Sequence, residues 1–202
     1  MAVNTLTLIG RDILIIAASY GAGCFTAGYY LFRWRTGHDI REYGSGNPGA
    51  RNVGRLLGPG WFVVTLLLDS TKGALAVCSA LHFGLSDLGV IVVMLATVSG
   101  HIWPLQLCFR GGRGVAASLG AGVVYTPTVT AIVLPVFVVL LALLRNSTLS
   151  GLLAFVLAPG VALLSGHGAL TTSGLSALAV LVLFAHRRDI REEIGQRLTR
   201  AK

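Results

Sequence analysis

The chain alternates long apolar runs, free of charged residues, with short polar stretches rich in glycine. Several runs approach the roughly 20 residues that a helix needs to cross a ~30 Å hydrocarbon core. Alternation with a period of two is absent, and lipid leaves exposed backbone groups without partners, so the pattern predicts bundled helices. The runs cover residues 13–32, 74–83, 88–99, 115–144 and 149–164.

The placement of arginine and lysine predicts the topology, because loops rich in these residues stay on the cytoplasmic side. Basic residues concentrate in two loops, about 33–55 and 109–114, and in a tail, about 186–202. A single helix over 115–144 would leave this tail outside. A break at Pro127 places all three regions inside, since proline disfavours a helical conformation of the residue before it.

The sequence therefore predicts an all-α, polytopic membrane bundle of about seven transmembrane segments, with the N-terminus outside and the C-terminus in the cytoplasm. The segment 115–126 is short, about 18 Å at 1.5 Å per residue, and is expected to pack inside the bundle. The other spans are expected near residues 12–32, 56–82, 88–108, 148–164 and 170–185, with one more after Pro127.

Small residues four positions apart predict close packing of helices within this bundle. The pairs are Ala17 with Gly21, Gly23 with Ala27, and Ala116 with Gly120.

Composition supports a lipid environment, since 54% of the 202 residues are hydrophobic and 12% are charged. The net charge of +8 sits in clusters that flank the spans, so membrane topology is a better explanation of it than nucleic-acid binding.

No basic region precedes the first apolar run, which is expected to stay as a membrane anchor. Cys24, Cys78 and Cys108 lie singly and are expected to be reduced core residues, and neither a metal nor a cofactor is expected.

The first basic loop combines glycines with neutral donors and arginines. Glycine lets the backbone approach a ligand and aim successive amides at an anion. Arg51 and Arg55 offer guanidinium groups suited to phosphate, and a helix beginning near Asn52 would turn its positive end toward the same anion. A plain interhelical turn is the alternative reading of the segment 43–55.

The second basic loop, residues 109–115, repeats this pattern at the start of another apolar helix. It lacks the lysine-serine or lysine-threonine ending of a P-loop, so nucleotide hydrolysis is not expected. Just upstream, His101 is a candidate for a phosphate contact or for a structural role. Asp69 and Lys72 lie three residues apart in an apolar helix, where charges are costly, so a structural pair is favoured over direct substrate contact.

The chain resembles the bacterial acyl-phosphate:glycerol-3-phosphate acyltransferases, the PlsY family, over most of its length. The resemblance implies one membrane domain over residues 1–202 in the bacterial plasma membrane, with its active site facing the cytoplasm. The residues that carry it are Gly44 to Asn47, Gly49, Ala50, Asn52, Val53, Asp69, Lys72, Gly73, Gly100, His101, Pro104, Gly111, Gly112, Gly114 to Ala116, His186 and Arg187.

The resemblance implies transfer of a fatty acyl group from acyl phosphate to the 1-hydroxyl of glycerol 3-phosphate, giving lysophosphatidate and phosphate. Membrane lipids are the further implied partners, and the oligomeric state stays open, a monomer included. Direct attack by the glycerol hydroxyl is expected, because acyl phosphate is already activated and no nucleophile with an oriented base is visible.

The same resemblance implies the roles of individual residues. Ser45, Arg113 and His186 are the expected catalytic residues, with Thr148 standing for a serine of the family. The expected substrate and phosphate contacts are Gly46, Asn47, Gly49, Asn52, Arg55, His101, Arg110, Gly111, Gly112, Gly114 and Thr148.

The chain departs from the family pattern at several of these positions. Lysine is usual where this chain has Arg110 and Arg113, threonine where it has Arg51, and asparagine where it has Asp189. A carboxylate near a phosphate repels it unless an arginine such as Arg188 neutralises the charge. A divergent relative with another donor or acceptor, or without activity, is therefore an alternative. A transporter of a phosphorylated metabolite is a third, which would predict internal repeats that are not found.

Overall fold

The computed structural model describes residues 5–191, so the first residues and the basic tail beyond Arg191 lie outside the described range. Every regular element within that range is helical. The α-helices are α1 (Thr5–Cys24), α2 (Ala27–Thr36), α3 (Ala50–Leu57), α4 (Pro59–His82), α5 (Asp87–Ile102), α6 (Val115–Tyr125), α7 (Pro127–Leu144), α8 (Ser147–Leu164) and α9 (Ala169–Ala185), and the 3-10 turns are η1 (Ile40–Glu42) and η2 (Leu105–Leu107).

Five helical segments of this range are long and apolar enough to cross a membrane, and α6 and α9 are shorter apolar helices. The predicted break in the run 115–144 is confirmed, because α6 ends at Tyr125 and α7 begins at Pro127. Thr126 between them has φ −133° and ψ 66°, outside the helical region. Proline at the first position of α7 costs no intrahelical hydrogen bond, since that amide would have no helical partner.

The expected span near residues 12–32 falls within the segment Leu8–Thr36, which is long and apolar enough to cross a membrane, but its helix is broken between Cys24 and Ala27. Distant side chains bind the carbonyl groups that the break releases. Lys72 Nζ donates to the carbonyl oxygens of Gly23 at 3.1 Å and Phe25 at 2.6 Å. Gln106 Nε2 donates to that of Cys24 at 2.7 Å, so the break leaves no carbonyl group of residues 23–25 without a donor.

The expected span near 56–82 corresponds to α4, which is long and apolar enough to cross a membrane and begins three residues later than expected. A short helix, α3, begins at Ala50 rather than near Asn52 and ends at Leu57. Gly58, with φ 101°, turns the chain into α4, which begins at Pro59. A left-handed φ of this kind is open to glycine and closed to most other residues.

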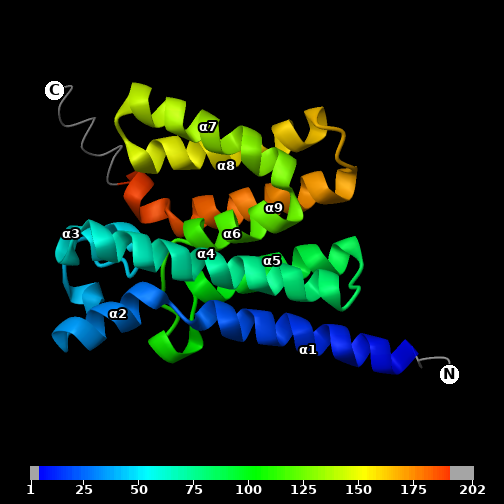
Figure 1. Ribbon diagram of the computed structural model, residues 1–202, viewed down its shortest axis with the longest axis horizontal. Coiled ribbons are helices and arrows are strands. Elements are labelled where there is room, and N and C mark those ends of the chain that lie inside the picture. The colour runs from blue at the N-terminus through cyan, green and yellow to red at the C-terminus, as the bar shows by residue number, and fades with distance from the viewer. Residues whose placement is uncertain (1–4, 192–202) are drawn as a thin grey trace.

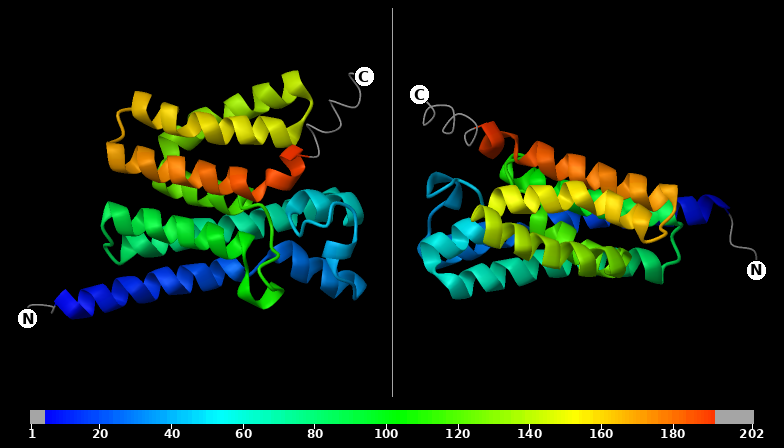
Figure 2. Two further views of the ribbon diagram at one scale, coloured as in Figure 1. Left: turned by 180° about the vertical axis from the view of Figure 1, so that it is seen from behind. Right: turned by 90° about the horizontal axis from the view of Figure 1, so that it is seen from above.

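The helices form a bundle whose two ends carry different loops. One end holds α2, α3, the α7–α8 link and the end of α9, while the α4–α5 and α8–α9 links and the beginning of α1 lie at the other (Figures 1 and 2). The segment that joins α5 to α6 projects from the bundle nearer the first of these ends (Figure 1). The basic loops of the described range therefore gather toward one end.

Glycines set the closest helix contacts. A Cβ atom on Gly23 would collide with the Thr97 carbonyl oxygen, so α1 and α5 touch backbone to backbone there, and one on Gly120 would collide with the Ser70 carbonyl oxygen between α6 and α4. These contacts confirm close packing for the pairs that include Gly23 and Gly120. Gly21 has nothing within 4 Å, so the expected packing at that pair is wrong.

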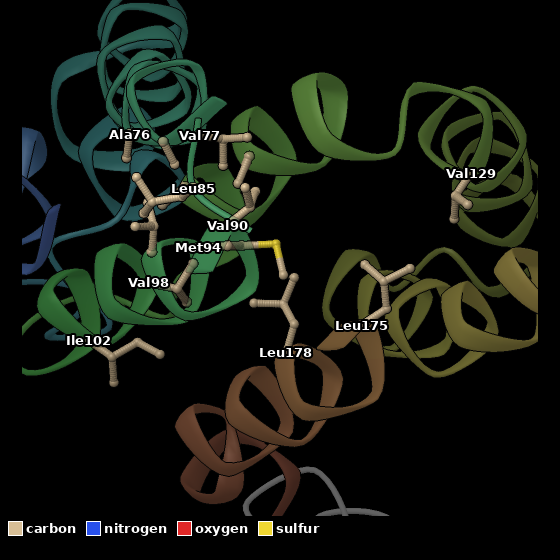
Figure 3. Close-up of a cluster of buried hydrophobic side chains, with 14 of the residues drawn as sticks. Ala76, Val77, Leu85, Val90, Met94, Val98, Ile102, Val129, Leu175 and Leu178 are labelled. Carbon is tan, nitrogen blue, oxygen red and sulfur yellow. The ribbon is translucent and has the colours of Figure 1, made fainter. Parts of the chain in front are cut away.

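The buried core surrounds α5. Val90, Met94 and Val98 of this helix are each 0% exposed, and Figure 3 shows them between side chains of α4 and of α9 such as Val77 and Leu178. A helix that is apolar on all sides is the kind that belongs at the centre of a bundle.

All three cysteines are free, as expected. Cys24 is buried, but Cys78 and Cys108 are exposed, so the expectation that all three belong to the core is wrong for two of them. Cys78 lies on an outward face of α4, and Cys108 lies in the turn after η2, where apolar character does not imply a core position.

Candidate functional site

Asn52 organises the first glycine-rich loop from within. Its side chain is buried, its Oδ1 accepts from the Ser45 amide at 3.0 Å, and its Nδ2 donates to the Tyr43 carbonyl oxygen at 2.9 Å. Gly44 and Gly46 take left-handed φ values of 60° and 68°, which fold the segment around that amide. Asn52 thus shapes the loop, and Ser45 is left exposed at its surface.

The same loop leads into α3. Asn47 Oδ1 accepts from the Gly49 amide at 3.2 Å, and Gly49 is the residue that precedes the helix. Arg51 and Arg55 then lie one turn apart on α3, and both are exposed. The loop and the first turns of α3 therefore present a hydroxyl group and two guanidinium groups at the same end of the bundle.

The second glycine-rich loop is tied to the end of α5. The amides of Gly111 and Gly112 donate to the carbonyl oxygens of Ile102 and His101, each at 3.0 Å. A Cβ atom on Gly111 would collide with the His101 carbonyl oxygen, and one on Gly112 with the His101 ring. In this arrangement the two glycines provide close approach to α5, and their amides are already used. Gly114, with φ 82°, then begins α6.

Arg113 joins this loop to the end of α9. Its Nη1 donates to the Ala185 carbonyl oxygen at 2.5 Å, and its Nη2 contacts Asp189 Oδ1 at 2.6 Å. Its Nε is buried and has no hydrogen-bond partner among residues 5–191. The arginine that neutralises Asp189 is therefore Arg113 and not Arg188.

Arg110, in the same loop, is exposed, and the structure does not bring it into this ion pair.

His186 follows α9 and is buried. Its Nδ1 lies 2.8 Å from the Val182 carbonyl oxygen, which only accepts, so Nδ1 carries the proton and Nε2 has a free lone pair. Burial lowers the pKa of His186, and the charges of Arg113 and Arg51 lower it further, against the opposing effects of Val182 and Asp189. The imidazole is therefore held in its neutral form, with Nε2 able to accept a proton.

Arg51 and Thr148 connect α3 to the beginning of α8. Arg51 Nη1 donates to Thr148 Oγ1 at 2.7 Å, across 97 positions of the chain. Loss of solvation lowers the pKa of Arg51, the Arg55 charge lowers it further, and Asp189 opposes both effects. Thr148 thus lies at the same end as the predicted site residues. Its contact with Arg51 is one that the sequence pattern did not indicate.

Asp69, Lys72 and His101 form a separate, buried cluster. Lys72 Nζ lies 2.9 Å from Asp69 Oδ1, which confirms the predicted pair. The same nitrogen lies 2.8 Å from His101 Nδ1. His101 is 2% exposed and sits beneath Gly112, so the structure does not bring it among the exposed arginines.

The residues at the basic end are of kinds that suit phosphate. Arg51, Arg55, Arg113 and His186 come together from α3, the second loop and the end of α9, and Asp189 is the carboxylate among them. Guanidinium groups match the geometry of phosphate oxygens. Within the described range, no group of at least three His, Cys, Asp or Glu residues could hold a metal ion.

Comparison with known proteins gives a consistent picture. The family model described as glycerol-3-phosphate acyltransferase matches residues 13–196. The chain is 44% identical over 186 residues to glycerol-3-phosphate acyltransferase 1 of Desulfitobacterium hafniense (strain Y51), covering 92% of each chain. It is 38% identical over 179 residues to glycerol-3-phosphate acyltransferase of Synechococcus sp. (strain CC9902), covering 89% of this chain and 90% of the relative.

Two solved structures share the fold. Both are crystal structures of PlsY (YgiH), an integral membrane glycerol 3-phosphate acyltransferase. The glycerol 3-phosphate form matches with a TM-score of 0.87 and 28% identity, over 93% of this chain and 94% of that one. The lysophosphatidic acid form matches with a TM-score of 0.85 and 26% identity, over the same shares.

Proposed function

We propose that this chain, which belongs to the glycerol-3-phosphate acyltransferase family and acylates glycerol 3-phosphate in phospholipid synthesis, takes its acyl group from acyl phosphate at the basic end of the bundle. The observation that carries the proposal is the excess of cations over carboxylates there. Within the described range, Arg113 pairs with Asp189, and the charges of Arg55 and Asp189 both shift the pKa of Arg51, so this cluster holds three arginines and one carboxylate. Such an excess stabilises two phosphorylated substrates at once, which an acyl phosphate donor requires.

The residues of the first loop and α3 are suited to contact the substrate phosphates. Ser45 and the loop around Gly46, Asn47 and Gly49 are suited to contact one phosphate, with Asn52 holding the loop in shape. Arg55 is suited to bind the phosphate of glycerol 3-phosphate, because its guanidinium group can contact two oxygens at once.

Residues from the second loop and α8 complete the set. Arg110 and Thr148 are proposed as outer phosphate contacts, and Gly111, Gly112 and Gly114 as the turns that place the loop. Arg113 has a buried Nε–H group without a partner among the described residues, and we assign that group to the charge developing on the acyl carbonyl oxygen or the departing phosphate.

The reaction follows from these roles without a covalent enzyme intermediate. The 1-hydroxyl oxygen of glycerol 3-phosphate attacks the acyl carbonyl carbon, and the bond between that carbon and the phosphate oxygen breaks. The products are lysophosphatidate and inorganic phosphate. The hydroxyl proton passes to Nε2 of His186 or to a substrate phosphate oxygen, and the neutral form of His186 leaves Nε2 able to accept it.

The proposal includes an orientation in the membrane. The basic loops of the described range gather toward one end, and positively charged loops stay on the cytoplasmic side. Seven crossings, counting α1 with α2 as one and including the short α6 and α9, give an external N-terminus and a cytoplasmic active site.

The test is acyl transfer by purified protein in lipid or detergent, given palmitoyl phosphate and glycerol 3-phosphate. The expected result is release of phosphate and lysophosphatidate in equal amounts, lost in Arg113→Ala and kept in Arg35→Ala. The second variant is matched in charge, because Arg35 lies on an exposed face of α2. Product from acyl-CoA or acyl carrier protein but not from acyl phosphate would exclude the proposed donor. No product from any donor, with folded protein, would exclude the proposed function.

A further inference from the structure

Lys72 lies at the point where the first membrane helix breaks. Its ammonium group has Asp69 Oδ1 at 2.9 Å, the carbonyl oxygens of Phe25 at 2.6 Å and Gly23 at 3.1 Å, and His101 Nδ1 at 2.8 Å. An ammonium group has only three protons to donate to these four acceptors. The buried side chain of Lys72 thus fastens the break between α1 and α2 to α4.

The contact between Lys72 and His101 orients the ring. His101 Nδ1 lies 2.8 Å from Lys72 Nζ and 3.6 Å from Asp69 Oδ1. The shorter contact fits a hydrogen bond that Nδ1 accepts from the ammonium group, a pairing that places the proton of the neutral ring on Nε2. The ring is then oriented by Lys72 and faces the backbone of Gly112 with that nitrogen.

His101 in turn contacts the second loop through both its backbone and its ring. Its carbonyl oxygen accepts from the Gly112 amide at 3.0 Å, and its ring occupies the space where a side chain at position 112 would begin. Arg113 is the next residue along the chain. A continuous series of contacts therefore runs from the helix break, through Lys72 and His101, to the loop that presents Arg113.

Both glycine-rich loops are anchored to this cluster. The first follows α2, whose first residue, Ala27, donates its amide to Asp69 Oδ1 at 3.3 Å. The second rests on His101. Burying the charges of Asp69 and Lys72 is expensive, and apolar residues of similar volume often give equal stability. A buried ion pair at this point is therefore better explained by the positions it defines than by stability alone.

We propose that Lys72 and His101 are positioning residues for acyl transfer, which set the second loop and Arg113 relative to the first loop through the ring of His101 and the backbone of Gly112. The inference rests on the proposed function for its kinetic effect, while the loop position itself is measurable without any substrate. A misplacement of about 1 Å at such a distance from the chemistry costs up to about 100-fold in rate.

The first experiment is a double-mutant cycle between Gly112→Ala and His101→Asn. The new Cβ atom in Gly112→Ala would collide with the ring, so the loop and Arg113 are displaced and kcat/KM for glycerol 3-phosphate is expected to fall about tenfold. Asparagine at 101 keeps an acceptor for Lys72 and removes the outer part of the ring. The double variant is expected to recover at least about threefold in kcat/KM relative to Gly112→Ala.

Gly111→Ala is the matched control. Its Cβ atom would collide with the carbonyl oxygen of His101 and approach Pro104 Cδ to 2.5 Å, and shortening the His101 side chain moves neither group. His101→Asn is therefore expected to rescue Gly112→Ala and not Gly111→Ala. Equal rescue of both, or rescue of neither, would overturn the proposed role of the ring.

A substrate-free measurement separates this inference from the proposed function. Cys108 is exposed two residues before Arg110, and Cys24 is buried, so in a Cys78→Ala background a maleimide reports mainly on the entry to the second loop. Gly112→Ala is expected to raise the alkylation rate of Cys108 at least about threefold, and the double variant to restore it. An unchanged rate in Gly112→Ala would contradict the inference even if the enzyme proved inactive with every donor.

The role of Lys72 is tested by removing both charges together, in the double variant Asp69→Asn with Lys72→Met, which leaves no unpaired buried charge. We expect a folded protein whose kcat/KM for glycerol 3-phosphate falls about tenfold. Wild-type kcat/KM together with wild-type alkylation of Cys108 would show that the pair only stabilises the fold. If this variant does not fold, the Gly112 and His101 cycle decides the question.

Discussion

Replacing Arg113 by alanine removes two contacts and leaves the Asp189 carboxylate to repel a bound phosphate. The bonds lost are those from Nη1 to the Ala185 carbonyl oxygen and from Nη2 to Asp189. Asp189 is then left without this partner, and its carboxylate repels any phosphate bound nearby. Arg113→Lys keeps the positive charge and a donor for the developing charge, but a single ammonium group reaches only one of the two acceptors, the Ala185 carbonyl oxygen or Asp189, well.

The cost of Arg113→Ala in stability depends on how exposed the Arg113–Asp189 ion pair is. The side chains of Arg113 and Asp189 are 24% and 35% exposed, so their ion pair contributes about 0.2–1 kcal/mol to stability. The bond to the Ala185 carbonyl oxygen, with a charged donor, contributes about 1.5–3 kcal/mol. Loss of a donor that stabilises developing charge costs about 2.7–4 kcal/mol in the transition state, or about 100- to 1,000-fold in kcat.

The assay is phosphate release with palmitoyl phosphate and glycerol 3-phosphate, with the thermal unfolding midpoint measured in parallel. Arg113→Ala is expected to lose about 100- to 1,000-fold in kcat, and Arg113→Lys to stay within about tenfold of the wild type. Asp189→Asn, which removes the carboxylate and keeps Arg113, is expected to hold or lower the KM for glycerol 3-phosphate. A folded Arg113→Ala enzyme within about threefold of wild-type kcat would refute the role assigned to this arginine.

Two further predictions concern the acid limb of activity and the helix contacts. Because only neutral His186 accepts a proton and its pKa is lowered, kcat/KM is expected to fall with acidification at a midpoint below the ordinary histidine value of about 6.5, measured between pH 5 and 8. A midpoint above that value would argue against His186 as the base. Gly120→Ala is expected to destabilise the bundle by about 1–3 kcal/mol, because its Cβ atom would meet the Ser70 carbonyl oxygen. Gly160→Ala is the control, with nothing within 4 Å of the new atom, and a lower unfolding midpoint there would contradict the packing argument.

Hydropathy and proline placement were enough to predict where most helices lie. The expected spans near 56–82, 88–108, 148–164 and 170–185 correspond to α4, α5, α8 and α9, and the divided run at Pro127 corresponds to α6 and α7. These signals are local, because a proline limits the residue beside it and an apolar run reports directly on its own solvent. The resemblance to a known family likewise depends on short motifs and named the substrate that the relatives' names share.

The break between α1 and α2 could not be predicted in this way. Phe25 and Thr26 carry no helix-breaking signal, and the groups that make the break tolerable, Lys72 and Gln106, lie far along the chain on other elements. A break in lipid is stable only when the released backbone groups find partners. Those partners exist only once α4 and the α5–α6 segment have packed against α1.

The same reasoning applies to the functional site. The sequence by itself predicted that arginines, glycines and His186 would gather at one end of the bundle, because basic loops on one side of a membrane protein must be separated by an even number of spans. Only the tertiary structure decided that Arg113 pairs with Asp189, 76 positions away. It also decided that the amides of Gly111 and Gly112 donate to carbonyl oxygens at the end of α5. Pairings across such separations depend on helix packing at the scale of single atoms, as the glycine contacts between helices show.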